Sequence, residues 1–137
     1  MTAETPPAPG PHRVRSYLGS PGLLLLNHVS VMLREAYDVV PYLVGSSTLT
    51  RAWRDVDVRI MVPDLRFEQM FPGLRDPLHR NPLWSLHCGS VSLWMRDATG
   101  LPVDFQVQPV SYANALFGSK PRIPLGIYPI EQPREGS

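Results

Sequence analysis

Hydrophobic and polar residues alternate strictly in two short segments of the chain. The segment DVDVRIMV (residues 55–62) places valine and isoleucine on one side and Asp55 and Asp57 on the other. The segment LPVDFQVQP (residues 101–109) repeats the pattern, with Asp104 on its polar side. Successive side chains of a β-strand point to opposite faces of a sheet. The two segments therefore predict strands with one apolar and one polar face.

A longer segment with apolar residues at three- and four-residue spacing follows Pro21. This spacing predicts a helix over residues 23–40 (LLLLNHVSVMLREAYDVV). The side chains expected to face the core are Leu25, Val29, Met32, Leu33 and Ala36. The overlapping segment VVPYLVG (residues 39–45) is rich in β-branched residues and ends in glycine. This composition predicts a buried strand that stops at a turn.

A second long helix is predicted over residues 83–100 (LWSLHCGSVSLWMRDATG). Its expected inward face carries Trp84, Cys88, Val91 and Met95. Gly89 and the serine and valine content leave a hairpin as the alternative. Earlier in the chain, Asp64 is placed to cap a short helix over residues 65–71, and a loop separates that helix from this one.

The order of these elements is helix, strand, turn, strand, helix, helix, strand. This order predicts an α/β (α+β) fold with a mixed sheet and helices packed on its apolar face. The 16 prolines cluster near the ends and mark the expected domain boundaries. Residues 1–13 are predicted to be a disordered Pro-rich leader, residues 14–118 the folded domain, and residues 119–137 a Pro-rich extended tail without regular structure.

Composition narrows the class of protein. With 43% hydrophobic and 18% charged residues, the chain can bury a core, and its net charge of +1 provides no basic field for nucleic acid. Cys88 is the only cysteine, which excludes an intrachain disulfide and a cysteine-based zinc site. The apolar segment at residues 23–26 is too short to span a bilayer, and residues 1–13 lack a signal-peptide core. We expect a soluble, cytoplasmic protein without a membrane partner.

The polar faces of the two predicted strands carry the candidate chemistry. Asp55 and Asp57 project from the same side, roughly 6–7 Å apart along the strand. Carboxylates this close repel each other, and a divalent cation between them removes that cost. Mg²⁺ suits such a site because it binds carboxylates together with substrate phosphate. Asp104 completes the site if its strand neighbours the first, and the turn at residues 45–47 is expected to hold a phosphate.

At these residues the chain resembles the DNA polymerase β-like nucleotidyltransferase superfamily. The signature is a strand ending in Gly-Ser, a short helix and a strand carrying Asp-x-Asp, matched here by LVGSSTLTRAWRDVDVRIMV. A third acidic residue on a later strand completes the signature. The resemblance implies that Gly45 and Ser46 hold nucleotide phosphates. It also implies that Asp55, Asp57 and Asp104 bind two Mg²⁺ or Mn²⁺ ions, and that Asp104 helps to activate the attacking hydroxyl.

The expected function is that of a metal-dependent nucleotidyltransferase, which moves a nucleoside monophosphate from a nucleoside triphosphate to a hydroxyl acceptor. A protein side chain, an RNA end and a small molecule all remain open as acceptors. The alternative is a catalytically inactive binding or interaction module with the same fold. Larger members of the superfamily hold their acceptor with an extra helical domain, for which this chain has no room. A partner protein or a homodimer is therefore expected to supply that surface.

Two residues near the site have alternative roles. Arg59 lies two residues beyond Asp57 on the same face, where it either contacts a phosphate or pairs with Asp57. Ser47 either joins the phosphate-binding turn or caps the short segment that follows. The Asp-x-Asp segment also fits an ordinary half-buried strand with a solvated polar face. In that case the chain is simply an α/β domain whose sheet has one polar face.

Overall fold

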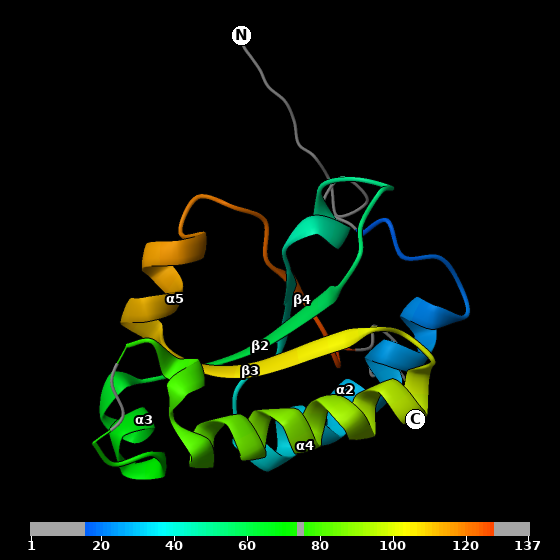
Figure 1. The fold of residues 1–137 in the computed structure, drawn as a ribbon. Helices are drawn as coiled ribbons and strands as arrows, with labels where there is room; N and C mark the ends of the chain where they lie inside the picture. Colours follow the sequence, from blue (N-terminus) through cyan, green and yellow to red (C-terminus); the bar gives the residue numbers. More distant parts are fainter. Residues whose placement is uncertain (1–15, 74–75, 128–137) are drawn as a thin grey trace, which may run out of the picture.

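The computed structural model describes residues 16–73 and 76–127 (Figure 1). Its centre is a four-stranded mixed sheet in the order β3-β2-β1-β4. The strands are β1 (Tyr42–Val44), β2 (Val56–Val62), β3 (Val103–Pro109) and β4 (Ile123–Pro124). Strand β1 is antiparallel to both β2 and β4, whereas β2 and β3 are parallel. The predicted fold class, a mixed sheet combined with helices, is confirmed.

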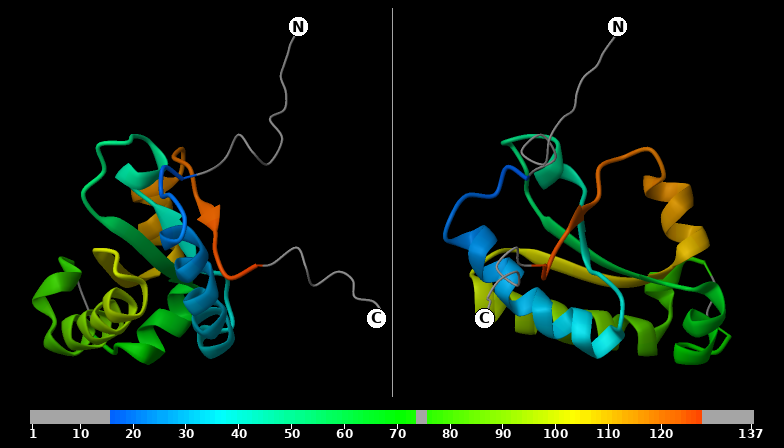
Figure 2. Two further views of the ribbon diagram at one scale, coloured as in Figure 1. Left: turned by 90° about the vertical axis from the view of Figure 1, so that its right-hand side faces the viewer. Right: turned by 180° about the vertical axis from the view of Figure 1, so that it is seen from behind.

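Two long helices, α2 (Gly22–Tyr37) and α4 (Pro82–Thr99), cover one face of the sheet (Figures 1 and 2). On the opposite side lie the short helix α5 (Val110–Phe117) and the 3₁₀ turn η1 (Ser46–Thr48), towards different ends of the strands. The remaining helical elements are α3 (Asp64–Met70) and the 3₁₀ turn η2 (Leu78–Arg80). Within the described ranges, none of the helices has both the length and the apolar character that crossing a membrane requires.

The alternating pattern of β2 and β3 decides which face of the sheet the helices cover. The apolar side chains on one face of both strands are fully buried: Val56, Val58, Ile60, Val62, Val103, Phe105 and Val107. They pack in one core with side chains of α2 and α4, among them Leu26, Leu33, Trp84, Cys88 and Met95. Because the side-chain period of a strand is two, Asp57 and Asp104 must then project from the opposite face.

The core-facing side of α2 differs from the predicted one by about one residue. Leu26, Ser30 and Leu33 are buried, whereas Met32 is 62% exposed and Leu25 is 39% exposed. Four consecutive leucines begin this helix, so the spacing of its apolar residues does not fix its rotation. Packing against the sheet and α4 selects the face. The helix also ends at Tyr37 rather than residue 40, because Asp38 adopts a left-handed conformation (φ 59°).

Three further elements either differ from the sequence prediction or decide between the alternatives that it left open. Residues 82–99 form the helix α4 and not a hairpin. Asp64 does not cap α3, because its Oδ1 accepts a hydrogen bond from the Ser111 backbone N–H (3.1 Å) instead. Helix α5 was not predicted. Its eight residues follow β3 without a linker, so no turn signal separates the helix from the strand.

The beginning of the predicted C-terminal tail belongs to the sheet. Ile123–Pro124 form β4, which pairs with Tyr42 and Leu43 of β1, and Leu125 is fully buried. The prediction that this segment has no regular structure is therefore wrong for β4. Pro124 is tolerated because proline fits a short strand at the edge of a sheet. The predicted leader at residues 1–13 and the tail beyond residue 127 lie outside the described residues.

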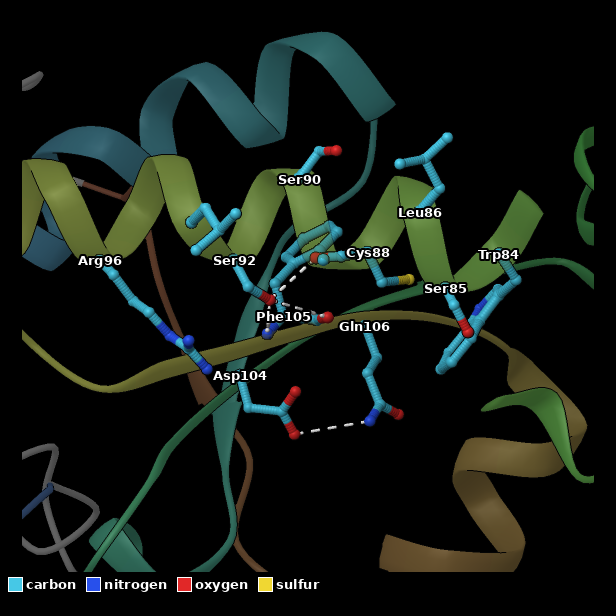
Figure 3. A pocket seen from close by; sticks show the side chains of 12 residues that line it. Trp84, Ser85, Leu86, Cys88, Ser90, Ser92, Arg96, Asp104, Phe105 and Gln106 are labelled. Carbon is cyan, nitrogen blue, oxygen red and sulfur yellow. Dashed lines mark hydrogen bonds between the residues drawn. The ribbon is translucent and has the colours of Figure 1, made fainter. Parts of the chain in front are cut away.

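Side chains of α4 hydrogen-bond to the outer edge of β3 (Figure 3). These side chains recur every four residues, at Trp84, Cys88, Ser92 and Arg96, so they share one face of the helix. The bonds are Arg96 Nε to Val103 O (2.8 Å), Phe105 N to Ser92 Oγ (2.9 Å), Val107 N to Cys88 Sγ (3.5 Å) and Trp84 Nε1 to Val107 O (2.9 Å). An edge strand whose backbone groups are already paired cannot recruit another strand through them. Helix α4 therefore closes this edge of the sheet.

Candidate functional site

Asp57 and Asp104 are register partners on neighbouring strands. They pair directly in the parallel β2–β3 ladder, so their side chains project from the same face of the sheet. Val44, the last residue of β1, pairs with Asp57 on the other side. The turn that begins at Gly45 therefore starts beside Asp57. The expectation that the strand of Asp104 neighbours the Asp-x-Asp strand on the same face is confirmed.

Gly45 packs against the carboxylate of Asp57. Its backbone adopts φ 81° and ψ −159°, a conformation that residues with a side chain rarely take. A Cβ at this position would overlap Asp57 Oδ2 and would lie 3.0 Å from its Cγ. Glycine is therefore required both by the turn and by the close approach of the turn to the carboxylate.

The short turn η1 after Gly45 is closed by Thr48. The backbone N–H and the hydroxyl of Thr48 both donate to Gly45 O, at 3.0 and 2.7 Å. Ser47 is fully buried, and within the part of the chain that the structure describes its Oγ has no hydrogen-bond partner. A buried hydroxyl cannot contact a ligand outside the protein. The half-buried Ser46, together with Gly45, remains the candidate for phosphate contact.

Arg59 is buried between the two carboxylates. The residue is 6% exposed, and its Nη2 lies 3.3 Å from Asp104 Oδ2 and 3.7 Å from Asp57 Oδ1. Its Nη1 donates to two backbone carbonyls, Asp104 O at 2.6 Å and Val58 O at 3.1 Å. Of the two roles open to Arg59 in the sequence, the structure shows the ion pair, and it extends the pair to Asp104.

The environment of Asp57 disfavours its charged form. Burial is the largest cause and raises the pKa of its carboxyl group above the ordinary value. The positive charge of Arg59 acts against this shift, whereas the negative charges of Asp104 and Asp55 add to it. A divalent cation at this position would relieve both the burial cost and the repulsion between the carboxylates.

Asp55 stands apart from the other two aspartates. It precedes β2 and is exposed, whereas Asp57 and Asp104 are partly buried. Among the described residues, no three or more His, Cys, Asp or Glu side chains are grouped closely enough to hold a metal ion. The structure thus brings together two of the three predicted metal ligands. One or two carboxylates combined with substrate phosphates are the usual protein ligands of Mg²⁺, so the Asp57–Asp104 pair fits such an ion.

Two glutamines extend the polar row along β3, away from Asp104. Gln108 Nε2 donates to Gln106 Oε1 at 3.0 Å, and Gln106 Nε2 lies 3.5 Å from Asp104 Oδ2. Gln108 is 1% exposed, and among the described residues its Oε1 has no partner. The sequence placed both glutamines on the polar face but assigned them no role. The feature of the sequence that could have pointed to these glutamines is their alternation with Val103, Phe105 and Val107.

A groove of about 490 Å³ runs between α4 and β3 and reaches this row (Figure 3). Asp104 and Gln106 line it from β3, while Ser85, Gly89 and Arg96 are among the residues that line it from α4. No side chain occupies the space beside Gly89, because a Cβ there would meet no atom within 4 Å. The groove therefore offers access to Asp104 from the edge of the sheet.

No family model matches the chain, and the searches of curated proteins and of solved structures found no match either. The features that indicate a function are therefore the geometry of the site and the motif that carries the resemblance.

Proposed function

We propose that this protein is a metal-dependent nucleotidyltransferase, which transfers a nucleoside monophosphate from a nucleoside triphosphate to a hydroxyl group. One observation carries the proposal: Asp57 and Asp104 are register partners on one face of the sheet, and the Gly45 turn packs against Asp57. This arrangement supports the motif resemblance, since a turn suited to phosphate and two carboxylates suited to Mg²⁺ lie side by side.

In the proposed reaction, the acceptor oxygen bonds to the α-phosphorus while the bond from that phosphorus to the β-phosphate breaks. Pyrophosphate leaves, and the proton of the acceptor hydroxyl passes to the carboxylate of Asp104. Bound Mg²⁺ or Mn²⁺ would supply charge stabilisation for the transferring phosphate. Asp57 would hold the ion together with Asp104, with Asp55 as a further ligand once substrate is bound. The backbone and hydroxyl of Ser46 would bind the nucleotide phosphates beside Gly45.

The acceptor side of the site is the groove between α4 and β3. Its lining includes one cation, Arg96, and one anion, Asp104, and is otherwise uncharged. A polyanion such as RNA binds through many basic contacts, which this groove does not provide. Among the acceptors open from the sequence, the groove therefore favours a protein side chain or a small molecule over an RNA end.

The experiment that tests this function is a transfer assay. The protein is incubated with each of four labelled nucleoside triphosphates, Mg²⁺ or Mn²⁺ and a cell extract that supplies acceptors. We expect label to be transferred, and we expect Asp57→Ala to lower the rate about 10²-fold or more, since it removes transition-state charge stabilisation. Ser46→Ala should weaken nucleotide binding by about 1 kcal/mol, the contribution of one hydroxyl contact.

Asp97→Ala serves as the control for this assay, because Asp97 is an exposed carboxylate on the last turns of α4. Its transfer rate should equal that of the wild type. The proposal fails if no label is transferred with any nucleotide or metal, or if Asp57→Ala transfers label at the rate of the control.

A specific observation favours a second candidate, a non-catalytic module that binds nucleotide or a partner. Arg59 already neutralises part of the charge between Asp57 and Asp104, at 3.7 and 3.3 Å. Such a site is stable without a metal ion. An ion pair with a structural role requires that stability, whereas catalysis does not. Nucleotide binding without transfer, in all combinations of nucleotide and metal, would favour this module. A partner protein or a second copy of the chain would then be the ligand to seek.

We place the reaction in the cytoplasm. The proposal rests on Cys88, which is buried and free, and on the absence of any other cysteine that could pair with it. Such cysteine use suits a reducing compartment.

A further inference from the structure

Arg59 is fixed to the sheet and cannot move away from the carboxylates without breaking its own bonds. Its Nη1 bonds to the backbone carbonyls of Val58 and Asp104, and its Nη2 contacts the carboxylate of Asp104. The residue is 6% exposed, so solvent does not replace these partners. A surface arginine could swing aside when a metal ion binds, but a buried one would lose several hydrogen bonds at once.

The charge of Arg59 is permanent as well as fixed. A guanidinium stays protonated in proteins, so the site cannot release this charge by titration. Asp57 and Asp104 bring two negative charges, the exposed Asp55 adds a third from outside the pair, and Arg59 offsets one of the three. A single divalent cation neutralises the remaining two. A second ion would bind next to a guanidinium and a metal ion in a partly desolvated site, where repulsion between like charges is strong.

We propose that Arg59 takes the place of a second metal ion, so that this site binds one divalent cation and not two. The inference rests on the proposed function, because it concerns the same carboxylates. It departs from the two ions that the motif resemblance implies. Arg59 then supplies from the protein itself one of the two positive charges that would otherwise come from metal.

The test is the number of Mn²⁺ ions bound per chain, measured by the loss of the free Mn²⁺ signal in electron paramagnetic resonance. The wild type should bind one ion. Arg59→Met keeps a long side chain but removes the charge. It should bind two ions, or bind the first about tenfold more tightly or better, because a fixed repulsive charge has been removed. Arg59→Lys should retain the stoichiometry of one.

Arg54→Met is the matched control, because Arg54 is an exposed arginine beside Asp55 and its loss changes the net charge equally. It should leave stoichiometry and affinity close to those of the wild type. Circular dichroism checks that each variant is folded. If Arg59→Met does not fold, the wild-type count still decides the question.

Three results would overturn the inference, and they differ in what they say about the proposed function. Two ions bound by the wild type would refute the role of Arg59 and leave the nucleotidyltransferase proposal standing. No ion bound by the wild type or by Arg59→Met would refute both. Equal tightening of Mn²⁺ binding in Arg54→Met and Arg59→Met would mean that net charge, and not the position of Arg59, sets the affinity.

Discussion

Gly45 and Asp57 are so close that no side chain fits between them. A Cβ on Gly45 would overlap Asp57 Oδ2, and the positive φ of Gly45 already disfavours any other residue. The turn after β1 and the carboxylate on β2 are thus built as one unit. The residue that shapes the turn also fixes how close the turn comes to Asp57.

The first prediction follows from this contact. Gly45→Ala should lower the free energy of unfolding by about 2–4 kcal/mol, since it adds both backbone strain and a collision. Gly100→Ala is the matched control, because Gly100 also has a positive φ (73°) but open space around its Cβ. It should cost about 1 kcal/mol. Chemical denaturation measures both, and equal losses would mean that the contact with Asp57 contributes nothing.

A second prediction concerns metal linkage. If Mg²⁺ or Mn²⁺ binds at Asp57 and Asp104, it stabilises the folded protein by mass action, by about 1.4 kcal/mol at ten times the dissociation constant. Melting temperatures with and without the metal detect this stabilisation. Asp57→Asn should abolish the shift, whereas Asp97→Asn should retain it. An unchanged shift in Asp57→Asn would place the bound metal elsewhere on the protein.

A third prediction concerns the edge of the sheet. Ser92 Oγ accepts the hydrogen bond of the buried Phe105 N–H at 2.9 Å. Ser92→Ala leaves that donor unsatisfied and should lower the free energy of unfolding by about 1–3 kcal/mol. Ser90→Ala, on the exposed side of the same helix, should change it by less than about 0.5 kcal/mol. Denaturation curves compare the two, and equal effects would contradict the role of Ser92 in closing the edge.

A fourth prediction concerns pH. His87 packs edge-on against Phe71 and shares a hydrogen bond of 2.7 Å with the Tyr37 hydroxyl, and burial lowers its pKa below the ordinary 6.5. Between the lowered pKa and about 6.5, the unfolded chain binds more protons than the folded one. The stability that comes from the neutral His87 is therefore complete above pH 6.5 and is lost as the pH falls through the lowered value.

Urea midpoints at several pH values between 7 and 5 test this linkage. His87→Gln cannot titrate and should show a weaker decline in stability over this window than the wild type. His28→Gln, at an exposed position of α2, should decline as the wild type does. If the His87→Gln protein declines as steeply as the wild type, another group causes the pH dependence.

The strands of the candidate site could be predicted from the sequence because their pattern is short-range. Alternation places Asp57 and Asp104 opposite the apolar side chains, whatever the rest of the chain does. The motif order also suggested that the two strands are neighbours, and the register of Asp57 with Asp104 confirms it. The glycine at position 45 was recognised as part of a turn, but its contact with Asp57 depends on the pairing of β1 with β2.

The remaining features depended on contacts between distant segments. The rotation of α2 was decided by the sheet, because four successive leucines satisfy more than one face. Strand β4 forms because residues 123–124 meet β1 across more than 75 positions of sequence, which a local pattern does not encode. The side chains of α4 that close the edge of β3 share a spacing of four residues. Which backbone groups of β3 they hydrogen-bond becomes visible only when α4 is packed against that strand.

The fold class, the two alternating strands and the polar face that carries Asp57, Asp104 and Arg59 could be predicted from the order of residues. These follow from local periodicity, which constrains the backbone before any tertiary contact forms. The pairing of Arg59, in contrast, depended on how the folded chain packs. From the sequence, that side chain reaches a phosphate or an aspartate equally well. Burial decides between them, because an arginine removed from solvent must be paired, and the nearest partners are the carboxylates of Asp57 and Asp104.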